Sequence, residues 1–178
     1  MSAVLEPAQG WHLAAQVTID PPPAGWREAL AARLGARPRR IGAWAELALY
    51  GAWQCLDAAG ETRLPADARL RVTSLGGPRD AARACLAQLR SGMPLPFDFM
   101  QSQPALMLAA LAKGLDWQGD ASYLVGRDLP RLTGLALCGA GPGGLLMGQV
   151  DEGPGSPRCT WQRWLPGLTV PRSRAADR

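Results

Sequence analysis

The sequence predicts an α/β domain in which helices cover the faces of a mixed five-stranded sheet. Strand-like and helical segments alternate along the chain, which favours parallel strands joined by right-handed crossovers. The last two strand-like segments have no helix between them, so we expect them to pair antiparallel. With 178 residues, 47% of them hydrophobic and 19% charged, the chain is long enough for one domain with a real core.

The first third of the chain predicts one strand and two helices. Residues 11–19 alternate loosely and predict a strand, which the proline-rich stretch 21–25 ends. A short amphipathic helix follows over 26–35. The longest helical signal covers 43–60 and is apolar over more than half of its circumference, so we expect this helix to be largely buried.

The middle of the chain predicts a strand followed by two helices. Alternation over 68–76 predicts the strand, and an apolar stripe predicts a helix over 78–92. The stretch 93–101 contains two prolines, so we expect a loop there and no regular helix. The second helix covers 102–115, with Ser102 as its expected N-cap.

A sharp strand-to-helix turn is predicted at YLVGRDLPRL, residues 123–132. The strand covers 121–126, and the helix covers 128–139 with Asp128 as its N-cap. Turns of this kind often present a nucleophile, but this one carries Arg127 and Asp128 and no Ser, Cys or Thr. Capping by Asp128 and catalysis by Asp128 are both possible interpretations.

The chain ends with two predicted strands, over 143–152 and 159–168. We expect the domain to cover 1–168 and a disordered tail to cover 169–178.

Composition argues against several classes of function. The net charge of +4 comes almost wholly from dispersed arginines, which is more typical of solvated faces than of nucleic-acid binding. No apolar run is long enough to span a bilayer and the start of the chain has no signal-peptide pattern, so we expect a cytoplasmic protein.

Cofactor and metal sites are also not indicated. The four cysteines form no CxxC pair and His12 is the sole histidine, so we expect neither a disulfide framework nor a metal site. The glycine-rich stretch 139–144 formally matches G-x-G-x-x-G, but too little chain follows it for a helix, so we expect no dinucleotide cofactor. We interpret Asp151 and Glu152 as solvated acids at a strand end.

An apolar cluster lies at FDFMQ, residues 97–101. It holds the only two phenylalanines of the chain, Phe97 and Phe99, together with Met100 and Gln101. Such side chains either anchor a partner or line an apolar channel, or they fill the core of their own domain. Both interpretations stay open.

The order of these segments over 40–152 resembles the N-terminal half of β-ketoacyl synthases, which have a thiolase-like fold. The segments that carry the resemblance are the helix AWAELALYGAWQCLDAAG, the strand RVTSLGG, the loop PLPFDFMQ, the helix SQPALMLAALAKGL, the link WQGDA, the turn YLVGRDLPRL and the strand LLMGQVDE. Within the superfamily the chain is similar to the chain-length-factor-like proteins of aryl polyene and related pigment clusters. The resemblance implies a single half of a thiolase-like fold.

The resemblance also implies that the condensation chemistry is absent. It places the turn Gly126, Arg127 and Asp128 where the family has its nucleophilic cysteine, and no thiol is there. The two histidines of the family's C-terminal half are missing as well, so no catalytic residue is assigned. By the same likeness, Phe97–Gln101 would lie at a dimer interface and wall off the partner's acyl channel.

Three functional hypotheses follow. The first is a catalytically inactive ketosynthase-like subunit that pairs with an active ketosynthase, or with itself, in polyketide or fatty-acid-like biosynthesis. The second is a small acyl-thioester enzyme with a non-standard site at Arg127 and Asp128. The third is a module that binds acyl carrier protein through its arginines.

Overall fold

A computed structural model describes residues 10–93, 95–152 and 157–167 of the chain. The elements are β1 (Trp11–Ile19), α1 (Trp26–Leu34), α2 (Gly42–Ala58), β2 (Arg69–Ser74), α3 (Arg79–Arg90), α4 (Pro96–Gln101), α5 (Pro104–Gly114), β3 (Asp120–Val125), α6 (Leu129–Leu137), β4 (Leu145–Glu152) and β5 (Pro157–Pro166). The expected domain limits at 1 and 168 and the expected tail at 169–178 lie outside the described residues.

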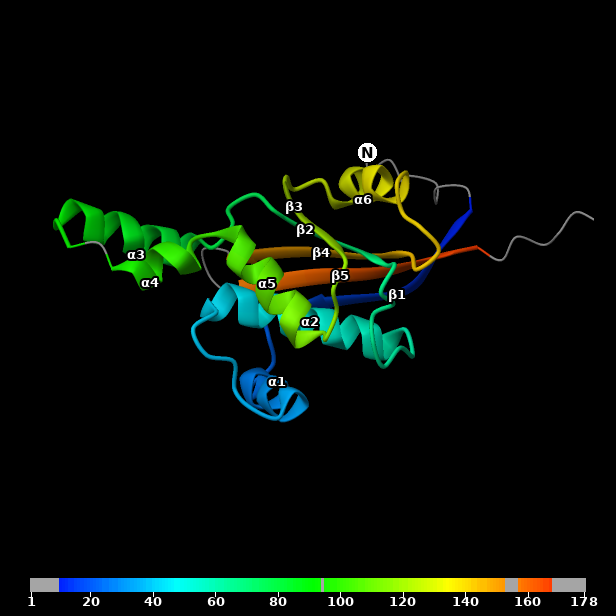
Figure 1. Cartoon of the computed structure of the whole chain (residues 1–178), viewed down its shortest axis with the longest axis horizontal. Helices are drawn as coiled ribbons and strands as arrows, with labels where there is room; N and C mark the ends of the chain where they lie inside the picture. The colour runs from blue at the N-terminus through cyan, green and yellow to red at the C-terminus, as the bar shows by residue number, and fades with distance from the viewer. Residues whose placement is uncertain (1–9, 94, 153–156, 168–178) are drawn as a thin grey trace, which may run out of the picture.

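The five strands form one mixed sheet in the order β1-β5-β4-β2-β3. Strand β2 runs parallel to β3 and to β4, whereas β5 runs antiparallel to β4 and to β1. This confirms the predicted α/β class and the antiparallel pairing of the last two strands. In Figure 1, helices α1, α2 and α5 lie on one side of the sheet, α6 lies on the other, and α3 and α4 project beyond one end.

The main core lies between the sheet and helices α2 and α5. Helix α2 buries side chains around most of its surface, as its composition predicts. The indole of Trp161 from β5 fits between two glycines: a Cβ at Gly51 or at Gly148 would lie only 2.6 Å or 2.7 Å from it. The two glycines therefore allow α2, β4 and β5 to pack closely around one large ring.

A smaller core lies under α6 on the opposite face of the sheet. Leu129 and Leu137 of the helix pack there against Leu145 and Met147 of β4. Trp164 packs against this cluster, whereas Trp161 belongs to the main core. The two tryptophans of β5 thus point to opposite faces, as expected for residues an odd number of positions apart on a strand.

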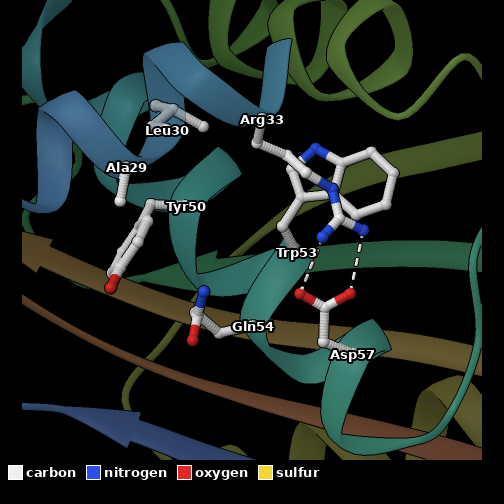
Figure 2. Close-up of a pocket in the computed structure, with 7 residues that line it drawn as sticks. All are labelled: Ala29, Leu30, Arg33, Tyr50, Trp53, Gln54 and Asp57. Carbon is white, nitrogen blue, oxygen red and sulfur yellow. Dashed lines mark hydrogen bonds and ion pairs between the residues drawn. The ribbon is translucent and has the colours of Figure 1, made fainter.

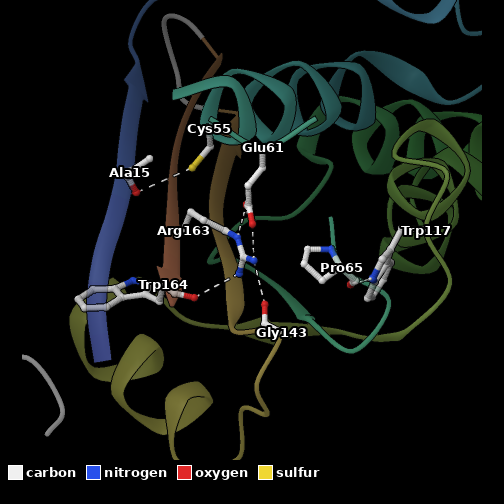
Figure 3. A network of polar contacts seen from close by, with 8 residues as sticks. All are labelled: Ala15, Cys55, Glu61, Pro65, Trp117, Gly143, Arg163 and Trp164. Carbon is white, nitrogen blue, oxygen red and sulfur yellow. Dashed lines mark hydrogen bonds and ion pairs between the residues drawn. The ribbon is translucent and has the colours of Figure 1, made fainter. Parts of the chain in front are cut away.

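A buried ion pair lies at the end of the sheet opposite to the carboxyl ends of the parallel strands (Figure 3). Arg163 is fully buried; its Nε and Nη2 donate to the carboxylate of Glu61 at 2.6 Å and 2.9 Å, and Nη2 also donates to the Gly143 carbonyl at 2.8 Å. The 139–144 stretch is therefore a turn from α6 into β4 whose carbonyl helps to satisfy Arg163. A strand follows it, so it lacks the helix that a dinucleotide site requires.

The expected absence of helix over 93–101 is wrong, because α4 spans Pro96–Gln101. Pro96 occupies the first helical position, where proline's missing N–H and fixed φ are tolerated. The N-cap expected for the next helix is wrong as well. Ser102 is the C-cap of α4 and its hydroxyl donates to the Phe99 carbonyl at 2.7 Å, so α5 starts after Gln103 instead.

Candidate functional site

The carboxyl ends of three parallel strands meet at one edge of the sheet, and the predicted turn lies there. Ser74 ends β2, Val125 ends β3 and Glu152 ends β4. The turn from β3 into α6 is held to this edge by the backbone. Gly126 donates its N–H to the Ser74 carbonyl at 3.1 Å, and its carbonyl accepts from the Thr73 hydroxyl at 2.9 Å.

Gly126 brings the turn close to the first part of α6. A Cβ at this position would lie 2.9 Å from Cδ1 of Leu132, so a larger residue would require the end of the Leu132 side chain to shift. The turn has the compact strand-to-helix form that the sequence predicts, and Gly126 leaves room in it for Leu132.

The polar residues of the turn do not form a catalytic arrangement with each other. Asp128 is the N-cap of α6, as predicted, and its carboxylate accepts from the Arg131 N–H at 3.1 Å. Arg127 and Asp128 are both exposed, and no ion pair joins them in the described part of the chain. Among the described residues, the hydrogen bond recorded for the Asp128 side chain is a helix cap.

Asp151 is tied to the end of β2, which differs from the solvated strand-end acid that we expected. Its Oδ1 accepts from the Ser74 hydroxyl at 2.7 Å, and its Oδ2 accepts from the Gln149 amide at 3.2 Å. The Ser74 oxygen in turn accepts the Gly77 N–H at 2.9 Å. The bond between Ser74 and Asp151 links neighbouring strands that are far apart in sequence, so no local pattern could have revealed it.

Glu152 is tied to the start of α3. Its Oε2 accepts the Asp80 N–H at 2.8 Å, so the carboxylate satisfies a free donor in the first turn of that helix. Burial raises the pKa of the Glu152 carboxyl, the Asp80 N–H opposes this shift, and the nearby Asp80 charge adds to it. The two acids thus hold the sheet edge together and are not a free pair for acid–base chemistry.

None of the four thiols lies in the turn itself, and Cys55, Cys85 and Cys159 are buried. Cys55 and Cys159 belong to the main core, and burial raises the pKa of each of these two thiols to about 12. Cys138 is exposed at the C-terminal end of α6, and its Sγ donates to the Gly134 carbonyl at 3.3 Å. Within the described ranges, no group of His, Cys, Asp and Glu side chains is arranged to hold a metal ion.

Helices α3 and α4 form an apolar arm that extends beyond the sheet (Figure 1). We define the arm as residues 79–101. Its large exposed apolar side chains are Leu86, Leu89, Met93, Leu95, Phe97, Phe99 and Met100. Phe99 is 57% exposed and Met100 is 48% exposed, so the interpretation of the cluster 97–101 as filling for the domain's own core is wrong.

A polar contact holds the two helices of the arm together. The Gln88 side chain donates to the Asp98 carboxylate, and its Oε1 accepts the Leu95 N–H at 3.0 Å. Because both contacts join α3 to α4, the apolar side chains are presented on a defined scaffold. Gln101 differs from its predicted partners in the cluster: it is half-buried, and its side chain lies against Gly42.

Exposed apolar residues also lie at the carboxyl ends of β2 and β3. Leu75, which follows β2, is exposed, and Val125 at the end of the edge strand β3 is 73% exposed. A row of exposed large apolar residues on one end of a molecule is typical of a protein–protein interface. Strand β3 is also at the edge of the sheet, so its outer backbone N–H and C=O groups can form hydrogen bonds with a strand of another chain.

Sequence comparison identifies no relative, whereas structural comparison does. No family model and no curated protein match the chain. Among solved structures, a ketosynthase (ApeO) in complex with its chain length factor (ApeC) from Xenorhabdus doucetiae matches with a TM-score of 0.64 and 17% identity, over 90% of this chain and 80% of that chain.

Two structures of proteins from Xanthomonas give weaker matches. OleA from Xanthomonas campestris, bound to lauric acid and lauroyl-CoA, has a TM-score of 0.51 at 11% identity. The 3-oxoacyl-(acyl carrier protein) synthase III, FabH, from Xanthomonas oryzae has a TM-score of 0.52, also at 11% identity. The chain covers 58% of each of these two structures, compared with 80% of the first.

The chain therefore has a thiolase-like fold, as its segment order predicts. All these structural neighbours are ketosynthase-like proteins of that fold. At these identities the similarity establishes the fold and leaves the activity to be argued from the site.

None of the helices in the described part of the chain is both long and apolar enough to cross a membrane.

Proposed function

We propose that the chain is a catalytically inactive, ketosynthase-like subunit that pairs with an active ketosynthase and shapes its acyl channel. The observation that carries this proposal is the arm 79–101, which presents several large exposed apolar side chains on two helices that contacts of Gln88 join. Leaving so many large apolar groups in water is unfavourable, and burial against a partner removes that cost.

The composition of the turn at Gly126–Asp128 supports the absence of condensation chemistry. A condensing enzyme needs a nucleophile at such a turn, and this one offers an exposed guanidinium and a capping carboxylate. One of the structural matches is a complex of a ketosynthase with its chain length factor, which supports a ketosynthase as the partner. From the resemblance of the sequence to chain-length-factor-like proteins, we propose that the chain acts in polyketide, aryl polyene pigment or fatty-acid-like biosynthesis.

Pairing through the arm explains why Phe97, Phe99 and Met100 are exposed in the isolated chain. These side chains would contact the partner and form part of the wall of its acyl channel, so their size would limit the length of the acyl chain that the channel accepts. Gln101, which lies against Gly42, would hold the end of α4 to the body of the domain.

The enzyme hypothesis at Arg127 and Asp128 finds less support, because Asp128 is exposed and engaged in capping. Asp128→Asn separates it from the subunit hypothesis. Asparagine caps helices as well as aspartate does, so this variant removes the acid and leaves the fold. The subunit proposal expects an unchanged product profile, whereas an acid–base enzyme would lose turnover.

The proposal is tested by reconstitution. An active ketosynthase from the same organism is assayed on acyl-carrier substrates alone, with the wild-type chain, and with the Phe99→Ala and Asp128→Asn variants. We expect the wild-type chain to increase the rate of condensation by the ketosynthase. The Phe99→Ala variant should shift the length distribution of the products. The Asp128→Asn variant should give the same rate and products as the wild type. Condensation by this chain without any ketosynthase would refute the proposal.

A further inference from the structure

Two hollows lie on the α2 side of the molecule, on either side of one arginine. Arg33 stacks its guanidinium 4.1 Å from the ring centroid of Trp53 and pairs with both oxygens of Asp57 at 2.8 Å and 2.9 Å. Figure 2 shows this arrangement in the smaller hollow, where Arg33 lies beside Tyr50 and Gln54. The charge of Arg33 is therefore already balanced by Asp57, and the smaller hollow offers no uncompensated charge to a ligand.

The larger hollow is a groove of about 680 Å³ with an apolar floor. It lies between the connector 34–41, helix α2 and the end of α5. The apolar side chains that line it are Leu34, Ala36, Pro38, Ile41, Leu49, Trp53 and Ala110. Its volume falls within the range of small-molecule sites, which is about 300–1,000 Å³.

The walls of this groove are held in place by specific contacts. The Trp53 indole donates to the Gly114 carbonyl at 3.2 Å, which fixes the ring against the end of α5. A Cβ at Gly114 would lie 2.5 Å from Leu49, so glycine allows α5 and α2 to approach at the floor. The groove is thus part of the packed structure of the domain.

The rim of the groove is cationic. Arg37, Arg39 and Lys113 line it and are exposed. Among the described residues, none of the recorded ion pairs involves these three side chains, and no acidic side chain lines the groove. An apolar floor beneath three uncompensated cations is complementary to a molecule with an anionic head and an apolar body.

We propose that this groove binds an anionic amphiphile, a carboxylate- or phosphate-headed ligand whose aliphatic chain lies along the Leu34–Ile41–Trp53 floor. The head group would lie at the rim beside Arg37, Arg39 and Lys113. The groove is separate from the turn at Gly126, because α2 and α5 cover one face of the sheet and α6 covers the other (Figure 1). It is also distinct from the apolar arm, so the proposal does not depend on the proposed function.

Isothermal titration of the purified chain with dodecanoate, below its critical micelle concentration, tests the proposal. We expect saturable binding that weakens with added salt, with dodecyl phosphate also binding and dodecyltrimethylammonium not binding. Octanoate should bind more weakly than dodecanoate by up to about fourfold for each methylene that the groove buries. Quenching of tryptophan fluorescence should decrease in the Trp53→Phe variant, which locates the ligand.

Charge-reversal variants separate the groove from other positive surface. We expect R37E/R39E/K113E to weaken dodecanoate binding by about tenfold or more. The matched control is R63E/R90E/R131E, which makes the same change in net charge at exposed arginines outside the groove. A second control, Phe99→Ser, tests binding to the arm.

The proposal is overturned by any of three results. These are no saturable binding of either anionic amphiphile, equal loss of affinity in the groove variant and its charge-matched control, or loss of binding only in Phe99→Ser. Binding of an acidic carrier protein that requires Arg37 and Arg39, without binding of either amphiphile, would also overturn it and would make the groove a protein-docking surface.

Discussion

Arg163 is fully buried, and its charge is balanced by Glu61, which lies 102 positions away in the sequence. The sequence offers no signal for this pair, because the alternation of β5 merely places Arg163 on one face of a strand. Two backbone carbonyls, of Gly143 and Trp164, accept its remaining hydrogen bonds. A charge buried so completely depends on every one of these partners.

We therefore predict that Glu61→Ala destabilises the fold by about 3–5 kcal/mol, because it leaves the Arg163 charge buried without a counterion. The double variant Glu61→Leu with Arg163→Met removes both charges and should recover most of this loss. Urea unfolding followed by circular dichroism measures both. Equal instability of the single and double variants would contradict the assignment of the cost to an unpaired charge.

Glu152 gives the fold a specific pH dependence. Burial raises the pKa of its carboxyl above the usual value of 4.5, so between the unfolded and folded pKa values the folded state holds more protons than the unfolded state. Its contribution to stability therefore decreases as the pH rises through that interval. Glutamine at this position stays neutral, and its carbonyl oxygen can still accept the Asp80 N–H.

We predict that Glu152→Gln gains stability relative to the wild type as the pH rises from about 4 to 7. The free energy required to unfold the variant, minus that of the wild type, should increase over this range. Urea titrations of both proteins across this range measure the difference. A difference that stays constant with pH would show that the Glu152 carboxyl titrates alike in the folded and unfolded states.

Among the elements, α2 and α6 show how one residue type serves opposite purposes. Gly51 in α2 and Gly148 in β4 leave room for the ring of Trp161, whereas Gly134 in α6 has no atom within 4 Å of its Cβ position. Glycine inside a helix costs about 0.5–1 kcal/mol relative to alanine unless packing requires it.

Alanine substitutions should consequently differ in sign. Gly134→Ala should stabilise the protein by about 0.5–1 kcal/mol, because it reduces the entropy of the unfolded chain and meets no obstacle. Gly51→Ala and Gly148→Ala should each destabilise it by about 1–3 kcal/mol through overpacking against Trp161. Thermal unfolding of the three variants provides the comparison, and a destabilised Gly134→Ala would indicate that α6 is packed against something at this face.

The elements were predicted well where periodicity is strong and poorly where local signals conflict. The apolar circumference of 43–60 correctly indicated a buried helix, and the alternation of Leu70 and Val72 indicated a strand. Helix α4 was missed, because prolines at 94 and 96 were interpreted as breaks although Pro96 starts the helix. Ser102 was misplaced for the same reason, since it ends a helix that was not expected.

At the scale of the whole molecule, segment order gave the fold and the antiparallel final strands, whereas contacts between distant segments were beyond reach. The bond from Ser74 to Asp151 joins residues 77 positions apart, and no local pattern encodes it. The form of the turn at Gly126 followed from the sequence, because glycine and the Asp128 cap are local features. The exposure of Phe99 and Met100 did not, because it depends on where the arm lies relative to the sheet.

The central claim is that the arm 79–101 is the surface through which this chain pairs with a ketosynthase. The dissociation constant of the complex with an active ketosynthase from the same organism, measured by analytical ultracentrifugation, tests it most directly. Variants Phe99→Ser and Leu95→Ser change the arm, and Leu13→Ser changes an exposed apolar residue on β1, at the opposite edge of the sheet.

We predict a defined complex whose dissociation constant rises about tenfold or more in each arm variant, because truncating a buried anchor costs over 1 kcal/mol, and is unchanged in Leu13→Ser. A monomer that forms no complex with the ketosynthase, or a complex that the arm variants leave intact, would contradict the account.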